Sequence, residues 1–195
     1  MNIVTNCFIR PLVSQETCGD FMKMLPGKRR IHFIVGDVSG HGSPLVYAIA
    51  REVEQCFEQC YRQPLAQQYA QIAELGSVAK YGMTLCLGFF DLERQALFYL
   101  AVGNLRLCRL NEQQKIDLPV TEGVVGIFVP SEIQEQILPL QAGDRVLVTS
   151  DGVSQQALSL FTAEQSVETL KTQFLDDSIT KQDDAICVCF DIVFE

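Results

Sequence analysis

Residues 83–110, MTLCLGFFDLERQALFYLAVGNLRLCRL, constrain the fold more than any other part of the chain. Three apolar runs are separated by two short turns, one at Asp91–Arg94 and one at Gly103–Asn104. Turns this short join antiparallel strands, because a parallel pair needs a crossover of a dozen or more residues. The stretch therefore predicts three consecutive antiparallel strands.

More strands are predicted on both sides of this stretch. We expect strands over residues 3–10, 20–25 and 31–36, in VVGIFV, SEIQEQILPL and DRVLVTSDGV, and in the closing run DAICVCFDIVF. Helices are expected from Pro44, from Leu65 to near Lys80, and over residues 161–174, because apolar residues recur there at helical spacing. Runs of strands with segregated helices are typical of an α+β fold, here an antiparallel β-sandwich flanked by helices.

Length and composition fit an ordinary globular protein. The 195 residues are 48% hydrophobic, which suits a single domain over residues 1–195. The chain has no apolar run of membrane-spanning length, and its first residues lack a signal-peptide pattern, so we expect a cytoplasmic location. The eight cysteines lie mostly in apolar runs and are expected to be reduced. A zinc site is disfavoured at Cys56 and Cys60, or at Cys187 and Cys189, because no His stands beside either pair at ligand spacing.

The formal net charge of −9 argues against two classes of partner. Nucleic-acid backbones and anionic membrane surfaces both need basic patches on the protein that binds them. We therefore expect neither nucleic acid nor membrane as a partner.

The glycine-rich turn GDVSGHG, residues 36–42, follows a buried strand and precedes a helix that Ser43 and Pro44 begin. It lacks the Lys of a phosphate-binding loop and the spacing of a dinucleotide fingerprint. An acid at its start, Asp37, would repel phosphate unless a cation lay between them. The turn is thus either a metal site or a tight connection, with Ser39 and His41 assigned to hydrogen bonding within it.

Other acids share the setting of Asp37, at a strand end or beside a glycine. They are Asp20 in TCGDF, Asp151 in VTSDGV, and Asp183 and Asp184 in KQDDAICV. Carboxylates are unfavourable to bury unless they are paired or bind a metal. A set of oxygen ligands without His or Cys suits Mg²⁺ or Mn²⁺, although spacing alone leaves open whether these acids meet in space.

Four motifs in order resemble those of the PPM family of metal-dependent protein serine/threonine phosphatases, in its SpoIIE-like branch. They are GDVSGHG, the strand pair within MTLCLGFFDLERQALFYLAVGN, GDRVLVTSDGVSQ and DDAICV. The resemblance runs from about Cys18 to the C-terminus. It implies α/β/β/α layers and two divalent cations, Mn²⁺ or Mg²⁺.

The resemblance also implies roles for single residues. Asp37 would bridge the two metals and act with Asp151 as a catalytic residue, through a water that the metals hold. The other implied metal ligands are the Val38 carbonyl, Asp20 near the second metal, and Asp151 with Asp183 at the first, Asp184 being the alternative to Asp183. Asn104 stands where relatives often have His and touches no expected ligand. No residue is assigned to phosphate binding; Arg10, Lys23 and Lys28 are the candidates.

The implied activity is hydrolysis of phosphoserine or phosphothreonine in a protein substrate. Relatives of this kind imply a bacterial partner-switching stress pathway, with STAS-domain proteins of the stressosome or anti-sigma-factor antagonists as substrates, and a monomeric enzyme. Two alternatives are a catalytically weak module of the same fold that binds phosphoproteins or a kinase, and a metal hydrolase of small phosphoesters.

Overall fold

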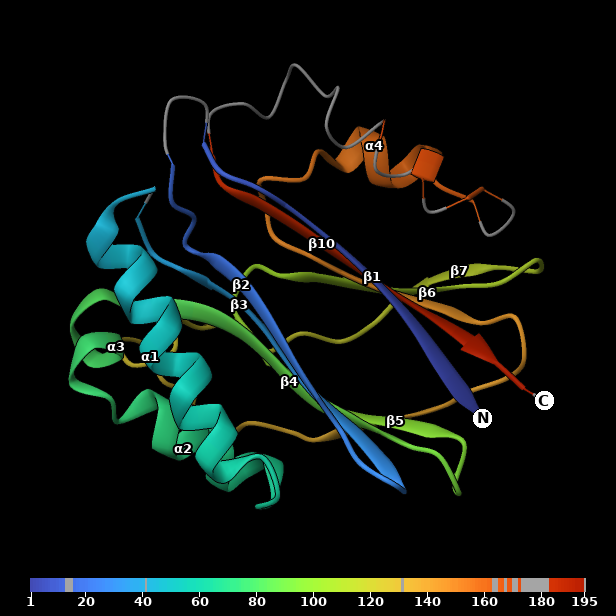
Figure 1. Cartoon of the computed structure of the whole chain (residues 1–195), viewed down its shortest axis with the longest axis horizontal. Coiled ribbons are helices and arrows are strands. Elements are labelled where there is room, and N and C mark those ends of the chain that lie inside the picture. The colour runs from blue at the N-terminus through green and yellow to red at the C-terminus, as the bar shows by residue number, and fades with distance from the viewer. Residues whose placement is uncertain are drawn as a thin grey trace.

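The computed structural model describes residues 1–12, 16–40, 42–130, 132–162, 165–166, 168–169, 172 and 183–194. Two five-stranded antiparallel sheets lie face to face in it, and helices cover both outer faces (Figure 1). The predicted α+β sandwich with α/β/β/α layers is confirmed.

Sheet I has the strand order β2-β3-β4-β5-β8. Its strands are β2 (Asp20–Pro26), β3 (Arg30–Val38), β4 (Met83–Asp91), β5 (Ala96–Val102) and β8 (Gln136–Pro139). Alternation along β3 fixes the register: Phe33 and Val35 face the other sheet, whereas Ile34 faces the helices. A slip by one residue would exchange the two faces, so the pairing is strongly specified.

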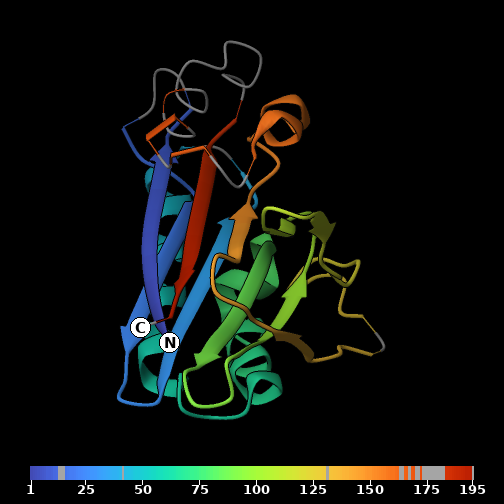
Figure 2. The same cartoon turned by 90° about the vertical axis from the view of Figure 1, so that its right-hand side faces the viewer.

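Sheet II has the order β1-β10-β9-β6-β7. Its strands are β1 (Asn2–Arg10), β10 (Ala185–Val193), β9 (Arg145–Thr149), β6 (Arg106–Leu110) and β7 (Lys115–Asp117). The first and last strands pair along their whole length, from Asn2 opposite Val193 to Arg10 opposite Ala185, as Figure 2 shows from the side. Residues from the two ends of the sequence therefore share one sheet.

Three phenylalanines fill the space between the sheets. Phe33, Phe90 and Phe190 are fully buried, and their ring centroids lie 4.8–5.5 Å apart. Tilted aromatic pairs at this separation add to the stabilisation from burial of apolar area. This core holds the two sheets together, and other side chains occupy the ends of the sheets.

Helices α1 (Pro44–Cys60), α2 (Leu65–Ala73) and α3 (Gly76–Tyr81) cover the outer face of sheet I. Helix α1 begins as predicted, because Ser43 Oγ accepts a hydrogen bond from the Val46 N–H at 3.2 Å. The single helix predicted up to Lys80 is wrong. It breaks at Leu75, whose extended backbone leads into Gly76, a poor helix former.

Two further predictions of secondary structure need correction. VVGIFV is not a strand: Val124 and Phe128 close a tight loop through reciprocal backbone hydrogen bonds, and Gly126 takes a left-handed conformation at φ +84°. Strand β7 was not predicted, since its three residues are all exposed and show no alternation.

Helix α4 (Gln155–Leu160) covers the outer face of sheet II. Leu158 and Phe161 pack there against Leu147 and Cys187. It precedes the helix predicted over residues 161–174, most of which lies outside the described residues. No helix in the described part of the chain is long and apolar enough to cross a membrane. All eight cysteines are free, as predicted.

Candidate metal centre

Asp20 and Asp37 face each other at one end of sheet I. Asp20 begins β2, Asp37 is the last residue but one of β3, and the two are direct partners in the antiparallel ladder. Directly opposed residues project from the same face with Cβ atoms about 5 Å apart. The alternation of β3 places Asp37 on the side of Phe33 and Val35, so both carboxylates point toward the space between the sheets.

Asp20 is buried and only partly hydrogen-bonded. Its side chain is 3% exposed, and Oδ2 accepts a hydrogen bond from Ser150 Oγ at 3.1 Å. The other oxygen, Oδ1, has no hydrogen-bond partner among the described residues. Burial, followed by the negative charge of Asp37, raises the pKa of Asp20 well above its usual value.

The pKa of Asp37 is raised as well. Burial, then the charges of Asp151, Asp183 and Asp184, raise its pKa to about 8. The acids predicted from separate motifs thus act on one another electrostatically. Val38 ends β3 beside Asp37, with its side chain fully buried and its N–H donated to the Gly19 carbonyl at 3.3 Å.

Asp151 lies on the exposed turn that follows β9. Its Oδ2 accepts a hydrogen bond from Asn104 Nδ2 at 2.7 Å, across from the turn between β5 and β6. The expectation that Asn104 touches no predicted ligand is therefore wrong. The contact joins residues 47 positions apart, so only the fold brings it about.

Asp184 has a different environment from the other acids. It is 3% exposed, and its carboxylate accepts three backbone N–H bonds, from Leu12 at 2.7 Å, Gly19 at 2.7 Å and Gly42 at 3.2 Å. It thereby ties the end of β1, the start of β2 and the glycine-rich turn to one point. Its neighbour Asp183 accepts the Asp184 N–H at 2.8 Å.

The turn at Asp151 packs closely against Asp184. A Cβ atom added to Gly152 would lie 1.9 Å from the Asp184 carbonyl oxygen, so only glycine fits without a shift of the backbone. Arg10, one of the basic candidates, donates from Nη2 to the Gly152 carbonyl at 3.4 Å. Lys23 instead pairs with Glu58, and Lys28 lies at the far end of the β2–β3 hairpin. His41 lies outside the described residues.

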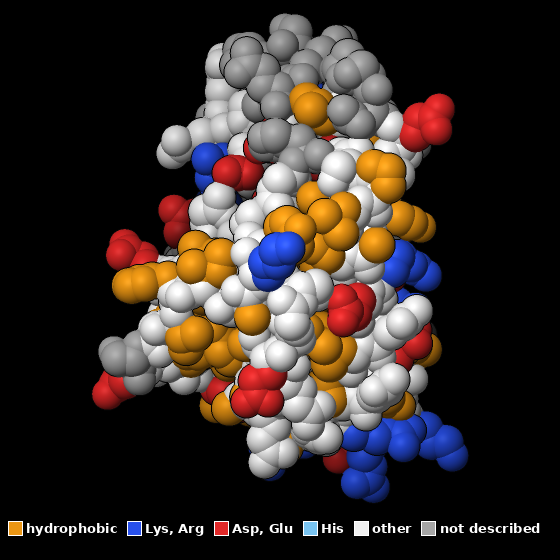
Figure 3. Space-filling model, turned by 90° about the vertical axis from the view of Figure 1, so that its left-hand side faces the viewer, with side chains coloured by type: hydrophobic (Ala, Val, Ile, Leu, Met, Phe, Trp, Pro, Cys, Tyr) orange, Lys and Arg blue, Asp and Glu red, His pale blue; other side chains and the backbone are white. Residues whose placement is uncertain are grey.

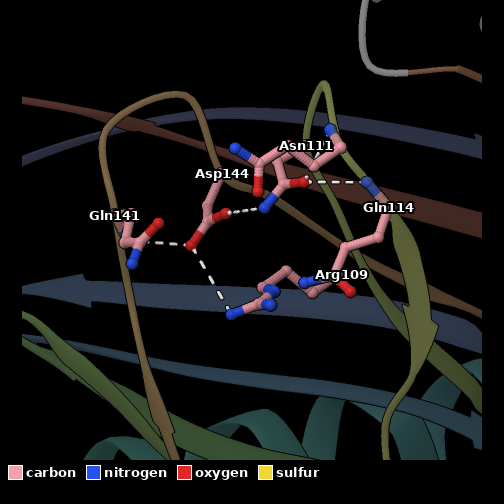
Figure 4. A network of polar contacts seen from close by, with 6 residues as sticks. Arg109, Asn111, Gln114, Gln141 and Asp144 are labelled. Atoms are coloured by element: carbon pink, nitrogen blue, oxygen red, sulfur yellow. Dashed lines mark hydrogen bonds and ion pairs between the residues drawn. The ribbon is translucent and has the colours of Figure 1, made fainter.

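Another buried acid, Asp144, is a carboxylate whose role in this chain is purely structural. Asp144, 1% exposed, accepts hydrogen bonds from Asn111 Nδ2 and the Gln141 N–H and pairs with Arg109 at 4.0 Å (Figure 4). Both of its oxygens are partnered. Asp20, which is as deeply buried, keeps one unpartnered oxygen and faces another acid.

The opposed carboxylates and the unpartnered Asp20 oxygen fit a cation. Within the described residues, no group of three or more His, Cys, Asp and Glu side chains is arranged so that it could hold a metal ion. The carboxylates of Asp20 and Asp37 nevertheless repel each other, and a cation between them would relieve that repulsion and occupy Asp20 Oδ1. The all-oxygen donor set suits Mg²⁺ or Mn²⁺.

Comparison with known proteins gives one family. Residues 27–190 match the family model of stage II sporulation protein E (SpoIIE). No curated protein matches the chain closely enough to count as a relative.

Solved structures with the same fold as this chain include the following three. One, from work on the bacterial stressosome as a modular system adapted to control secondary messenger signalling, is 21% identical with a TM-score of 0.80 and covers 97% of this chain and 100% of its own. RsbX in complex with magnesium is 17% identical, with a TM-score of 0.81 and coverage of 96% and 94%. The catalytic domain of the serine/threonine phosphatase PstP with two manganese ions is 16% identical, with a TM-score of 0.67 and coverage of 98% and 99%. At these identities the comparisons establish a shared fold.

Proposed function

The chain belongs to the SpoIIE family of PPM-type phosphatases, and from that membership we propose that it hydrolyses phosphoserine or phosphothreonine in a protein substrate. One structural observation supports the proposal in addition to family membership. Asp20 and Asp37 oppose each other at the end of two neighbouring strands, with one buried oxygen unpartnered. Such a pair is unfavourable without a cation and suited to hold one.

We assign the two proposed cations, Mn²⁺ or Mg²⁺, to residues as follows. Asp37 contributes to both ions, Asp151 and Asp183 complete the ligands of the first, and Asp20 and the Val38 carbonyl serve the second. When bound, two such ions activate a water molecule and neutralise the phosphoryl oxygens. The protein's own side chains position those groups and balance their charge.

The position of Asp184 beside Asp183 suggested a metal-ligand role, but the proposal gives Asp184 a different one. Its oxygens already accept three backbone N–H bonds, which leaves little room for a cation. We assign it to positioning, since it connects the segments that precede Asp20 and follow Asp37. Ser150 and Asn104 are positioning residues as well, because each donates a hydrogen bond to one proposed ligand.

The finer proposal is an RsbX-like function in a bacterial partner-switching stress pathway. The fold shared with RsbX and with the structure from the stressosome work supports it. The substrates would then be phosphorylated STAS-domain proteins of the stressosome or anti-sigma-factor antagonists. We further propose that residues 1–195 act as one domain, as a monomer, in the cytoplasm, where eight free cysteines stay reduced.

One observation favours a second candidate, a module of the same fold that binds phosphoproteins or a kinase and turns over slowly. The described side chains do not converge into a ready metal site. In this alternative the acids stay unmetallated, and the acidic end of the sheets contacts the partner directly.

Turnover separates the two candidates. We expect the purified chain to hydrolyse p-nitrophenyl phosphate and a phosphoserine protein in the presence of Mn²⁺, and to lose both activities in EDTA. Asp183→Asn should abolish Mn²⁺-dependent turnover, whereas Asp117→Asn, which removes an exposed acid on β7, should leave it unchanged. Binding of the phosphoprotein without hydrolysis at any Mn²⁺ concentration would favour the binding module instead.

A further inference from the structure

A basic pocket lies at the end of sheet I opposite the acidic pair. The cavity measures about 520 Å³ and opens between the β2–β3 turn, the β4–β5 turn and the end of α1. Figure 3 shows Lys and Arg side chains gathered at the lower end of the molecule. Arg30 is seven residues from Asp37 on the same strand, so the pocket and the acids are separated by about 23 Å.

The pocket concentrates positive charge on an acidic protein. Its lining includes five basic side chains and two acidic ones, a formal charge of +3, on a chain whose net charge is −9: Lys28, Arg29, Arg30, Arg62 and Arg94, with Asp91 and Glu93. One third of the fifteen Lys and Arg residues thus line a single cavity. Like charges repel, so such clustering is unfavourable unless an anion shares the site.

Two of the five cations form ion pairs with acids of the pocket. Arg29 pairs with Glu93 at 3.1 Å and Arg30 with Asp91 at 3.3 Å. Lys28, Arg62 and Arg94 form no ion pair with the described residues. The guanidinium groups of Arg62 and Arg94 lie 5.1 and 5.9 Å from the ring centroids of Tyr61 and Phe98, so aromatic faces hold both of them in place.

The wall of the pocket contains a buried histidine. His32 is 8% exposed and packs edge-on against Tyr61, with ring centroids 5.2 Å apart. Its Nδ1 has no hydrogen-bond partner among the described residues. Burial and the charges of Arg30 and Arg62 lower the pKa of His32 to about 4, so at neutral pH one ring nitrogen donates and the other accepts.

We propose that this pocket binds a compact anion with two or more phosphate groups. Arginine forks match phosphate oxygens in pairs, and the volume lies in the range of small-ligand sites. The guanidinium groups of Arg62 and Arg94 and the Lys28 ammonium group would contact the phosphates, and His32 and Tyr61 line the same cavity. Free pyrophosphate and a nucleoside diphosphate share this chemistry, and separate titrations tell them apart.

Calorimetry on the full chain tests the proposal with inorganic pyrophosphate and, separately, with ADP. EDTA is present throughout, so the result does not depend on the proposed metal centre or on phosphatase activity. We expect pyrophosphate to bind one site per chain. Arg62→Gln and Arg94→Gln should each weaken binding at least fivefold, because each removes a charged hydrogen-bond donor to phosphate. Tighter binding of ADP would identify a nucleotide as the source of the phosphates.

A matched control removes the same charge elsewhere. Lys80→Gln, on an exposed residue of α3 outside the pocket, should change the affinity for pyrophosphate less than twofold. His32→Phe keeps an aromatic ring and should weaken binding through the loss of its polar atoms. The proposal is overturned if wild-type protein shows no binding at millimolar pyrophosphate, if Lys80→Gln weakens binding as much as Arg62→Gln, or if only an acidic peptide binds.

Discussion

Ser150 Oγ donates a hydrogen bond of 3.1 Å to Asp20 Oδ2 and at the same time accepts the Ile186 N–H at 3.0 Å. Ser150 is fully buried and directly precedes Asp151. One hydroxyl therefore connects the first residue of β2, the turn after β9 and the start of β10. It also fixes which oxygen of Asp20 remains unpartnered.

Ser150→Ala is expected to weaken metal binding more than it weakens the fold. Removing a group that orients a metal ligand lowers metal affinity by about 10- to 100-fold. The lost hydrogen bonds lower the free energy of unfolding by about 1–3 kcal/mol. The free Mn²⁺ signal in electron paramagnetic resonance measures the affinity. Ser77→Ala, on α3, removes only an exposed hydrogen bond to Glu52 and should leave the Mn²⁺ affinity unchanged. Unaltered Mn²⁺ affinity in Ser150→Ala would remove the positioning role.

Asp184→Asn should mainly lower stability, whereas Asp183→Asn should mainly lower activity. An Asn at position 184 would turn an NH₂ group toward at least one of three N–H donors, so we expect a loss of about 2 kcal/mol in urea unfolding. Asp183→Asn should instead remove Mn²⁺-dependent activity with a smaller change in stability. If Asp184→Asn unfolds at the wild-type urea concentration, its three hydrogen bonds do not stabilise the site.

Gly152→Ala should disrupt the turn that carries Asp151. The added Cβ would meet the Asp184 carbonyl oxygen at 1.9 Å, and relief of that overlap requires a backbone shift that we expect to lower stability by about 3 kcal/mol. Gly76→Ala is the matched control, since its Cβ would meet no atom within 4 Å and alanine favours the helix. Thermal unfolding of both variants checks this, and equal melting temperatures would refute it.

His32 should make the fold sensitive to acid. Its pKa is about 4 in the fold and near 6.5 in an unfolded chain, so the unfolded state binds the proton first as the pH falls. Stability is therefore lost as the pH falls from 6.5 to 4, by up to about 3 kcal/mol. Unfolding of wild type and His32→Phe across this range measures the difference. Parallel pH profiles would mean that His32 has the same pKa in the fold and in the unfolded chain.

Much of the fold could be predicted from local patterns. The apolar runs of β3 to β5 and of β10, the short turn between β4 and β5, and the cap at Ser43 are properties of neighbouring residues, and the structure confirms them. The break at Leu75 and the loop around Gly126 were missed, because apolar composition there continues while the backbone conformation changes.

The site was predictable in its acids but not in their neighbours. Asp20, Asp37, Asp151, Asp183 and Asp184 were found from their settings and from family motifs, and whether they bind metal stays a prediction. Ser150, Asn104 and the three donors to Asp184 were not found. These contacts join residues 130, 47 and up to 172 positions apart, a separation at which periodicity and turn chemistry carry no signal.

Binding of Mn²⁺ to wild type and to Asp37→Asn tests the central claim most directly. The account predicts that wild type binds two Mn²⁺ ions per chain, measured by paramagnetic resonance and by calorimetry, and that Asp37→Asn loses at least one. Because burial, followed by repulsion from neighbouring acids, raises the pKa of Asp37, Asp37→Asn should be at least as stable as wild type in EDTA, so lost binding would not reflect unfolding. Equal Mn²⁺ binding by both proteins, or none by wild type, would contradict the account.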